Sequence, residues 1–235
     1  MNSTLNPSAL KNLIFDLGDV IIPIDLTAPI RNFAMLANMS EEQVRAIWKE
    51  HDLLNQYETG LIDDDAFRGH VRRLLNNRSD APDTASAVMP VRRCGHSDRS
   101  DRWADEVIDT AWNTVLLELP VERIERIKAL KPSYRLFLLS NTSPIHIRQV
   151  NAVLTQLNQP TLEQLFERVF YSYEVRMAKP SPDIYRHVLT KAGLVAEETA
   201  FFDDNAANIR AAAALGIQAV HVQPPMTILD YLRYV

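Results

Sequence analysis

The sequence contains a single cysteine, Cys94, so it cannot form an internal disulfide. This scarcity is typical of proteins from a reducing compartment, and we expect a cytoplasmic protein. No apolar run approaches the roughly 18 residues that a membrane-spanning helix needs. The opening residues, MNSTLNPSALKN, lack the basic segment followed by an apolar one that is typical of a secretory signal. We therefore predict a soluble protein with no membrane partner.

The chain also lacks an excess of positive charge, since its formal net charge is −5. Nucleic acids and anionic membranes bind basic surfaces, so we expect neither as a partner. An anionic small molecule stays compatible with this charge, because a metal ion and a lysine can reverse the field inside a cleft. Internal repeats and low-complexity tracts are absent as well.

What the chain does contain is four short segments, in this order: LIFDLGD around Asp16, LFLLSNTS around Ser140, MAKP around Lys179, and AFFDDNAAN around Asp203 and Asp204. In three of them a run of apolar residues, typical of a buried parallel strand, ends in a polar cluster. Open α/β sheets bind ligands beyond the carboxyl ends of their strands, so we expect these clusters to share one crevice. Carboxylates gathered there repel one another unless a cation lies among them, and Mg²⁺ is the natural candidate. The pattern favours phosphoryl transfer through an aspartate nucleophile.

The order of strand and helix signals predicts an α/β fold in two parts. Strands and helices alternate after Pro120, which suits a first helical turn, and this alternation predicts a parallel sheet. We predict a Rossmann-like, doubly wound parallel sheet in residues 1–24 and 118–235, with an inserted helical cap domain in residues 25–117. The predicted strands are 12–16 (continued by 20–22), 134–140, 168–172, 199–203 and 217–222, and the predicted helices outside the cap are 121–130, 144–157, 182–192 and 206–214.

Within the insertion, local signals predict several helices and one loop. Ser40 and Gln43 form a capping box, and Asp63 is typical of an N-cap. A further helix is expected to run from about residue 101 to 117. Residues 76–100 are poor in apolar side chains and contain Pro82, Pro90 and Gly95, so we predict a long loop there.

The order of the four segments, with a helical insertion after the first, resembles the haloacid dehalogenase (HAD) superfamily with a small helical cap. The likeness covers nearly the whole chain except the loop near residues 76–100. The FDLGDVI opening, the ETG element at Glu58 and Gly60, and the FFDDNAANI segment are similar to those of bacterial sugar-phosphate phosphatases. This resemblance implies a Mg²⁺-dependent phosphomonoester hydrolase that forms an aspartyl-phosphate, with a small phosphorylated metabolite, first of all a sugar phosphate, as substrate.

The resemblance also implies roles for individual residues. Asp16 would be the nucleophile, Ser140 and Asn141 would bind the transferred phosphoryl group, and Lys179 would neutralise its charge. From the cap, Glu58 would contribute to substrate binding.

A metal site is implied as well. Its ligands would be Asp16, Asp204 and the backbone carbonyl of Gly18, with Asp203 beside them as a ligand or as a support for one.

Plain structural roles stay open for the same residues. Asp16 could simply cap a turn, and Ser140-Asn141-Thr142 could form a helix N-cap. Lys179 could be a solvated loop residue, and Asp203-Asp204-Asn205 could be a turn. Asn208 could be a helix residue or a support for the metal site.

The clearest departure from the family is Gly18, because many HAD phosphatases carry there an aspartate that protonates the leaving alcohol. The adjacent Asp19 could replace that acid or could serve the turn alone. Losing general acid catalysis costs roughly 10²–10⁴ in rate, so good leaving groups such as a sugar anomeric oxygen would be favoured.

Two other functions stay open. A 2-haloacid dehalogenase also uses an aspartate and needs no leaving-group acid, but it works without metal and lacks an Asp-Asp pair. A catalytically weak binding or regulatory protein with the same fold is the other alternative.

Some cap residues have simpler interpretations. We expect Trp48, Trp103 and Trp112 to pack inside the cap, and Tyr57 to Gly60 to form either a loop into the cleft or a helix end stopped by glycine. Cys94 and His96 are too few for a zinc site. Both a monomer and a homodimer are compatible with the sequence.

Overall fold

The computed structural model describes residues 5–76 and 103–235. The predicted loop at 76–100, with Cys94 and His96, lies outside the described residues except for its first residue. No helix within the described ranges is both long and apolar enough to cross a membrane.

The centre of the molecule is a sheet of five parallel strands in the order β3-β2-β1-β4-β5. All four residues of β1 are buried, which explains why the strand is apolar throughout rather than alternating. In register, Phe15 of β1 lies beside Leu138 of β2 and Phe202 of β4. The strands are β1 (Asn12–Phe15), β2 (Arg135–Ser140), β3 (Arg168–Tyr171), β4 (Thr199–Asp203) and β5 (Gln218–His221). The predicted doubly wound parallel sheet is confirmed.

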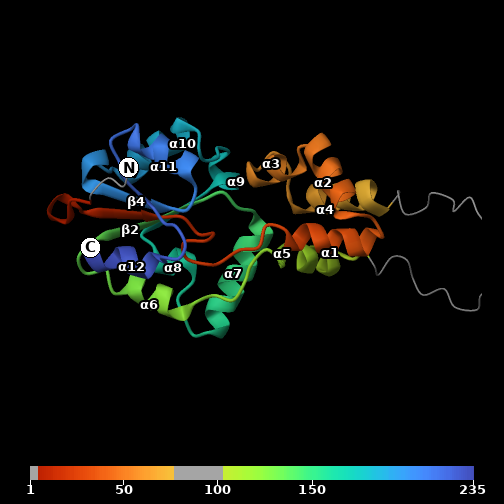
Figure 1. Cartoon of the computed structure of the whole chain (residues 1–235), viewed down its shortest axis with the longest axis horizontal. Coiled ribbons are helices and arrows are strands. Elements are labelled where there is room, and N and C mark those ends of the chain that lie inside the picture. The colour runs from red at the N-terminus through yellow and green to blue at the C-terminus, as the bar shows by residue number, and fades with distance from the viewer. Residues whose placement is uncertain (1–4, 77–102) are drawn as a thin grey trace, which may run out of the picture.

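Helices cover both faces of this sheet, because successive strand side chains point to opposite sides. Leu13 and Phe15 pack in one apolar cluster with α6, α7, α8 and α12, whereas Ile14 packs in another with α10 and α11 (Figure 1). The helices of this core are α6 (Val121–Lys128), α7 (Pro144–Gln156), α8 (Leu162–Leu165), α9 (Ser172–Val175), α10 (Pro182–Ala192), α11 (Ala206–Ala213) and α12 (Ile228–Tyr231), with short 3-10 turns at Pro7–Ala9, Ala196–Glu198 and Leu232–Tyr234.

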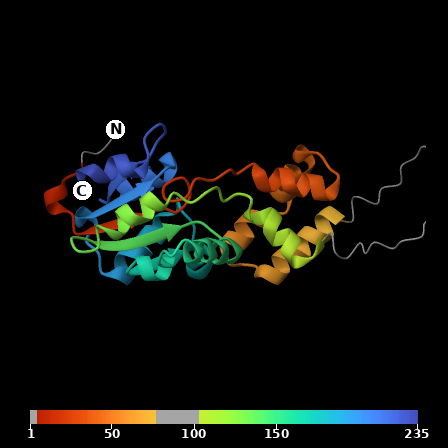
Figure 2. The same cartoon turned by 90° about the horizontal axis from the view of Figure 1, so that it is seen from below.

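The described residues between 28 and 113, which follow β1, form a separate helical unit, here called the cap, at one end of the elongated molecule (Figures 1 and 2). Its apolar centre is aromatic: the rings of Tyr57 and Phe67 stack at 4.2 Å. Trp48, Trp103 and Trp112 are buried in the same cluster, which confirms their predicted packing role. The cap helices are α1 (Ala28–Ala37), α2 (Glu41–Glu50), α3 (Leu53–Glu58), α4 (Asp64–Val71), a π-helix (Arg72–Asn76) and α5 (Asp105–Asn113).

Helix starts within the cap follow the predicted signals. Ser40 and Gln43 form the capping box of α2, and the Asp63 side chain accepts a hydrogen bond from the backbone N–H of Ala66 at the start of α4.

Two linkers join the cap to the core side by side. Ile24 and Leu116 form an antiparallel bridge, flanked by hydrogen bonds from Asp25 N to Val115 O (2.8 Å) and from Leu117 N to Pro23 O (3.1 Å). The domain boundaries predicted after residues 24 and 117 fall beside this bridge and stay a prediction.

Two local expectations are wrong. Residues 20–22 are not a strand, because Val20 N and Ile21 N donate back to Gly18 O and Leu17 O and so form a tight turn. The helix expected from 101 to 117 spans Asp105–Asn113 within the described residues, whereas α6 starts at Val121 as predicted, with Pro120 as its N-cap residue. Elsewhere strand and helix ends differ from the prediction by at most two residues, the largest difference being the end of α6 at Lys128.

Candidate active site

The carboxyl ends of β1 and β4 bring three aspartates together. Asp16 follows β1 directly, and its backbone N–H donates to Phe202 O of β4 at 2.9 Å. Asp203 ends β4 and Asp204 follows it. One carboxylate oxygen from each of the three lies within 4.8 Å of the others. The first and last of the four segments therefore meet at one edge of the sheet, as predicted.

Lys179 lies among these carboxylates. Its Nζ is 2.8 Å from Asp16 Oδ1 and 2.7 Å from Asp203 Oδ2, and its side chain is only 1% exposed, so it is no solvated loop residue. Burial alone would lower the pKa of Lys179, but the two carboxylates outweigh burial and raise it. The lysine therefore stays an ammonium ion.

Asn141 positions this lysine through its backbone. The Asn141 amide donates to Lys179 O and accepts from Lys179 N, both at 2.9 Å. Its side-chain oxygen and nitrogen thus hold the loop that carries Lys179, and the phosphate contact implied for Asn141 stays a prediction.

Asp203 is the fully buried anchor of the cluster. Its Oδ1 accepts hydrogen bonds from Asn205 N and the Asn208 amide, and its Oδ2 accepts from Lys179 Nζ and the same amide. Asn208 is therefore more than a helix residue. Asp204 is half-buried, and its backbone carbonyl is 2.7 Å from His221 Nε2 on β5, a contact that no local sequence pattern indicates.

The charges of the cluster do not balance. Burial raises the pKa of Asp16, and Asp203 adds to the shift although Lys179 opposes it. Burial and Asp203 likewise raise the pKa of Asp204. Three carboxylates share one ammonium ion, and this surplus of negative charge in a buried place is what a divalent cation relieves.

Ser140 ends β2 and is buried, but it does not cap the helix that follows. The N-cap residue of α7 is Ser143, directly before Pro144. The N-cap interpretation of Ser140-Asn141-Thr142 is therefore wrong. Among the described residues the Ser140 hydroxyl makes only a long contact of 3.4 Å with Asn141 O, which leaves it available to a ligand.

Gly18 and Asp19 lie in the turn after Asp16. The Gly18 carbonyl accepts the Val20 N–H at 2.6 Å and keeps a second lone pair. Asp19 has a φ of +53°, and its carboxylate accepts the Ile24 N–H at 3.0 Å. This contact favours the turn role of Asp19 over that of a replacement acid.

The cap closes over the lysine side of this site. A cavity of about 420 Å³ is lined by residues of both parts, among them Trp48, Glu58, Asn141 and Lys179. Glu58 is the last residue of α3 and lies at this cavity, whereas Tyr57 beside it points into the cap centre and donates to Asp64. The predicted helix end with a glycine stop is confirmed, since Gly60 has a φ of +66° and its N–H donates to Tyr57 O.

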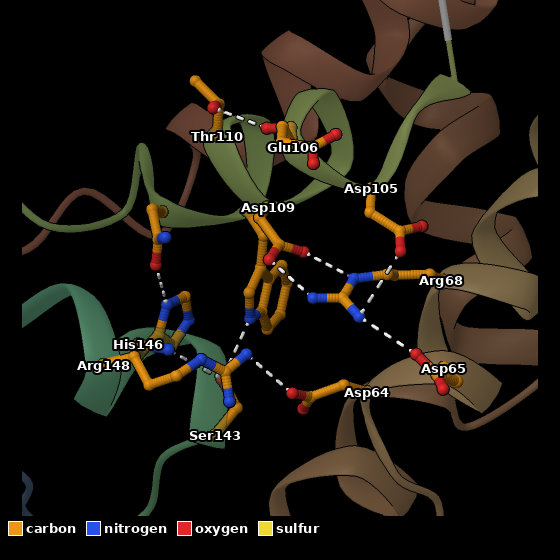
Figure 3. Close-up of polar contacts among 12 residues, drawn as sticks. Asp64, Asp65, Arg68, Asp105, Glu106, Asp109, Thr110, Ser143, His146 and Arg148 are labelled. Carbon is orange, nitrogen blue, oxygen red and sulfur yellow. Dashed lines mark hydrogen bonds and ion pairs between the residues drawn. The ribbon is translucent and has the colours of Figure 1, made fainter. Parts of the chain in front are cut away.

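A polar junction fixes the cap to helix α7 of the core. Arg148 forms an ion pair with Asp64 at 2.6 Å, and the Trp112 indole donates to the Ser143 hydroxyl at 3.0 Å (Figure 3). Ile145 of α7 joins the apolar cluster of the cap. These contacts hold the cap in place beside the carboxylate cluster.

The family profile of the haloacid dehalogenase-like hydrolases matches residues 10–216. The chain belongs to this family and is a hydrolase, as its resemblance predicted. Among characterised proteins, the D-ribitol-5-phosphate phosphatase of Bacteroides thetaiotaomicron is 22% identical over 209 residues, which cover 89% of this chain and 90% of that enzyme.

Solved structures agree with this assignment. A HAD family enzyme from Bacteroides thetaiotaomicron is 29% identical with a TM-score of 0.79, covering 95% of this chain and 98% of its own. The structure of that enzyme with magnesium and inorganic phosphate has a TM-score of 0.75 at 29% identity, covering 94% and 98%. The L-2-haloacid dehalogenase of Xanthobacter autotrophicus, at 19% identity, a TM-score of 0.54 and coverages of 91% and 77%, shares the fold alone.

Proposed function

We propose that the protein is a Mg²⁺-dependent phosphomonoesterase that forms an aspartyl-phosphate on Asp16. The observation that carries the proposal is the ammonium group of Lys179 held between Asp16 and Asp203, with Asp204 close by. A small sugar or polyol phosphate is the proposed substrate. The similarity to a ribitol-phosphate phosphatase and a cavity of about 420 Å³ beside Lys179 support this class.

The attacking atom follows from the hydrogen bonds of Asp16. Its Oδ1 accepts from Leu17 N at 2.7 Å and faces Lys179, while Oδ2 has no hydrogen-bond partner among the described residues. Oδ2 is thus free to attack phosphorus as the bond to the leaving oxygen breaks. Water then attacks the aspartyl-phosphate and releases inorganic phosphate, which restores the Asp16 carboxylate.

Lys179 and Ser140 serve the transferred group. The ammonium ion removes part of the repulsion between a carboxylate and a phosphate dianion and stabilises charge on the phosphoryl oxygens. The Ser140 hydroxyl supplies a hydrogen-bond donor at the same edge of the sheet. Asn141 acts by fixing the backbone of Lys179.

The donor set fits Mg²⁺, because it consists of oxygens with surplus negative charge. Asp16, Asp204 and the carbonyl of Gly18 would hold the ion, which would neutralise charge on the phosphoryl group. We assign Asp203 to holding Lys179, since both of its oxygens already accept hydrogen bonds from the protein.

The test is phosphate release from a panel of phosphorylated sugars and polyols, with Mg²⁺ and with a chelator, alongside release of halide from a 2-haloacid. We expect Mg²⁺-dependent phosphate release that Asp16→Asn abolishes without changing the circular dichroism spectrum. Halide release that persists in chelator would establish the dehalogenase alternative instead. Absence of both activities would leave the binding or regulatory protein. Cytoplasmic location and oligomeric state stay predictions.

A further inference from the structure

Each carboxylate that the described part of the core contributes to the site already has a role other than protonating the leaving group. An alkoxide is a poor leaving group unless it is protonated as its bond to phosphorus breaks. Asp16 is the nucleophile of the proposed function and Asp204 its metal ligand, Asp203 is held by Lys179 and Asn208, and Asp19 holds the turn at Ile24 N through Oδ1. Gly18, where related enzymes carry the acid, has no side chain.

Glu58 enters the same cavity from the cap. It shares the lining of this cavity of about 420 Å³ with Lys179 and Asn141 of the core. Its carboxylate forms no hydrogen bond and no ion pair with any residue within the described ranges, although Glu58 is partly buried. A partly buried carboxyl group without a hydrogen-bond partner costs free energy, and a polar group of the substrate can supply the missing partner.

The backbone fixes where Glu58 lies. Helix α3 ends in a glycine turn in which Gly60 N donates to Tyr57 O and Leu61 N donates to Gln56 O. A Cβ on Gly60 would lie 2.1 Å from the backbone carbonyl of Tyr173 on α9. Glycine therefore lets the end of α3 approach the core far more closely than any other residue could, and Glu58 is carried with it.

The protonation state of Glu58 suits proton donation. Burial raises its pKa to about 7, against the opposing charge of Lys179. Lys49 and Asp52 line the same cavity, and neither forms an ion pair with Glu58. Near neutral pH a substantial share of the Glu58 side chains carries a proton, as a general acid requires.

We propose that Glu58 is the general acid of this enzyme, a cap residue that replaces the acid missing at Gly18. The inference rests on the proposed phosphatase function. As Asp16 Oδ2 bonds to phosphorus and the bond to the leaving oxygen breaks, that oxygen takes the proton of Glu58. The Glu58 carboxylate then accepts a proton from the water that attacks the aspartyl-phosphate, so both carboxyl groups return to their starting state. Only a substrate whose leaving oxygen lies on the cap side of phosphorus meets this acid.

The experiment compares an alkyl phosphate with 4-nitrophenyl phosphate, whose leaving group needs no proton. We expect Glu58→Gln to lower kcat for the alkyl ester by about 10²–10⁴, and for the aryl ester by less than about tenfold. Glu58→Asp keeps a carboxyl group and should retain more alkyl-ester turnover than Glu58→Gln. Glu50→Gln, which removes the same charge from an exposed position of α2, is the matched control and should leave both rates unchanged.

Each outcome decides between a proton donor and a binding residue. A loss confined to the alkyl ester and expressed in kcat supports the proposal. An equal loss for both esters, a rise in KM alone, or no loss would overturn it, provided that circular dichroism shows a folded variant. If the wild-type protein hydrolyses neither ester with Mg²⁺, the proposed function itself fails, which is a different result.

Discussion

His146 makes the stability of the cap–core junction dependent on pH. The residue lies in α7 of the core, is 8% exposed, and its ring stacks on Trp112 of the cap at 4.8 Å (Figure 3). Its Nδ1 donates to Asn113 Oδ1 at 2.9 Å. Burial lowers the pKa of His146 from 6.5 to about 3, so the native imidazole is neutral at every moderate pH.

The size of the effect follows from proton binding in the two states. Below pH 6.5 the imidazole binds a proton in the unfolded chain but stays neutral in the native protein. The free energy of unfolding therefore decreases as the pH falls below 6.5, and this decrease ends near pH 3, where the native imidazole is protonated too. At about pH 5 protonated unfolded chains exceed neutral ones by about 30-fold, which stabilises the unfolded state by about 2 kcal/mol. At about pH 7.5 the same contribution is close to zero.

Urea unfolding at these two pH values measures the effect. All three tryptophans lie in the cap, so their fluorescence follows the part of the molecule that His146 contacts. His146→Gln and His146→Phe both remove the titration, while Phe keeps the stacked ring and Gln keeps a polar group. The stability difference between the wild type and either variant should therefore shrink by about 2 kcal/mol between about pH 7.5 and pH 5. If both variants lose as much stability on acidification as the wild type does, the buried neutral histidine is not its cause.

Three further predictions concern the metal site, the cap contact and the missing acid. Magnesium ions should raise the melting temperature of the wild type, as any ligand of the native state does, and this shift should vanish in Asp204→Asn. An equal shift in the variant would show that Asp204 is not a metal ligand. Gly60→Ala should destabilise the protein by 1 kcal/mol or more in urea unfolding, since its Cβ would meet a core carbonyl at a φ of +66°. The matched change Gly69→Ala, in open space within α4, should stabilise it by about 0.5–1 kcal/mol, and similar effects at both sites would contradict the close contact. In a Glu58→Gln background, Gly18→Asp should recover part of the alkyl-phosphate turnover, because the three atoms nearest to its Cβ all belong to the Ile24 side chain and the nearest, at 3.0 Å, is the flexible Cδ1. Phosphate release measures this recovery, and its absence would contradict the prediction.

The sequence predicted the edge of the sheet where the carboxylates meet, because the signal is local. An apolar run followed by Asp16, or by Asp203 and Asp204, is visible in a few adjacent residues, and parallel strands all end at the same edge. The different roles proposed for Asp203, which holds Lys179, and Asp204, which would bind the metal, were not predictable in this way. They depend on Lys179 and Asn208, whose contacts with Asp203 exist only after folding.

Other errors have equally physical causes. The start of α5 at Asp105 depends on tertiary contacts, since Arg72 donates to the carbonyl of Trp103 just before the helix. The N-cap at Ser143 was within reach of the sequence, because Pro144 after it suits a first helical position. The clamp of Asn141 on the Lys179 backbone joins residues that are distant in the chain, and no residue pattern at either one signals it.

The bridge between Ile24 and Leu116 also makes the cap exchangeable. Because the two ends of the insertion already lie side by side, a hairpin turn of two residues would be enough to close the core without it. The core has its own two apolar clusters, one on each side of the sheet. For the folding of the core the insertion is therefore equivalent to a long loop, and the entropy cost of closing a loop rises only slowly with its length. A helical unit of another size could be grafted at the same two residues, and the core surfaces to be refitted would be those around Ile145 on α7 and Tyr173 on α9. The nucleophile and the lysine at the sheet edge would stay in place through such an exchange, whereas the substrate and the proposed proton donor would change with the cap.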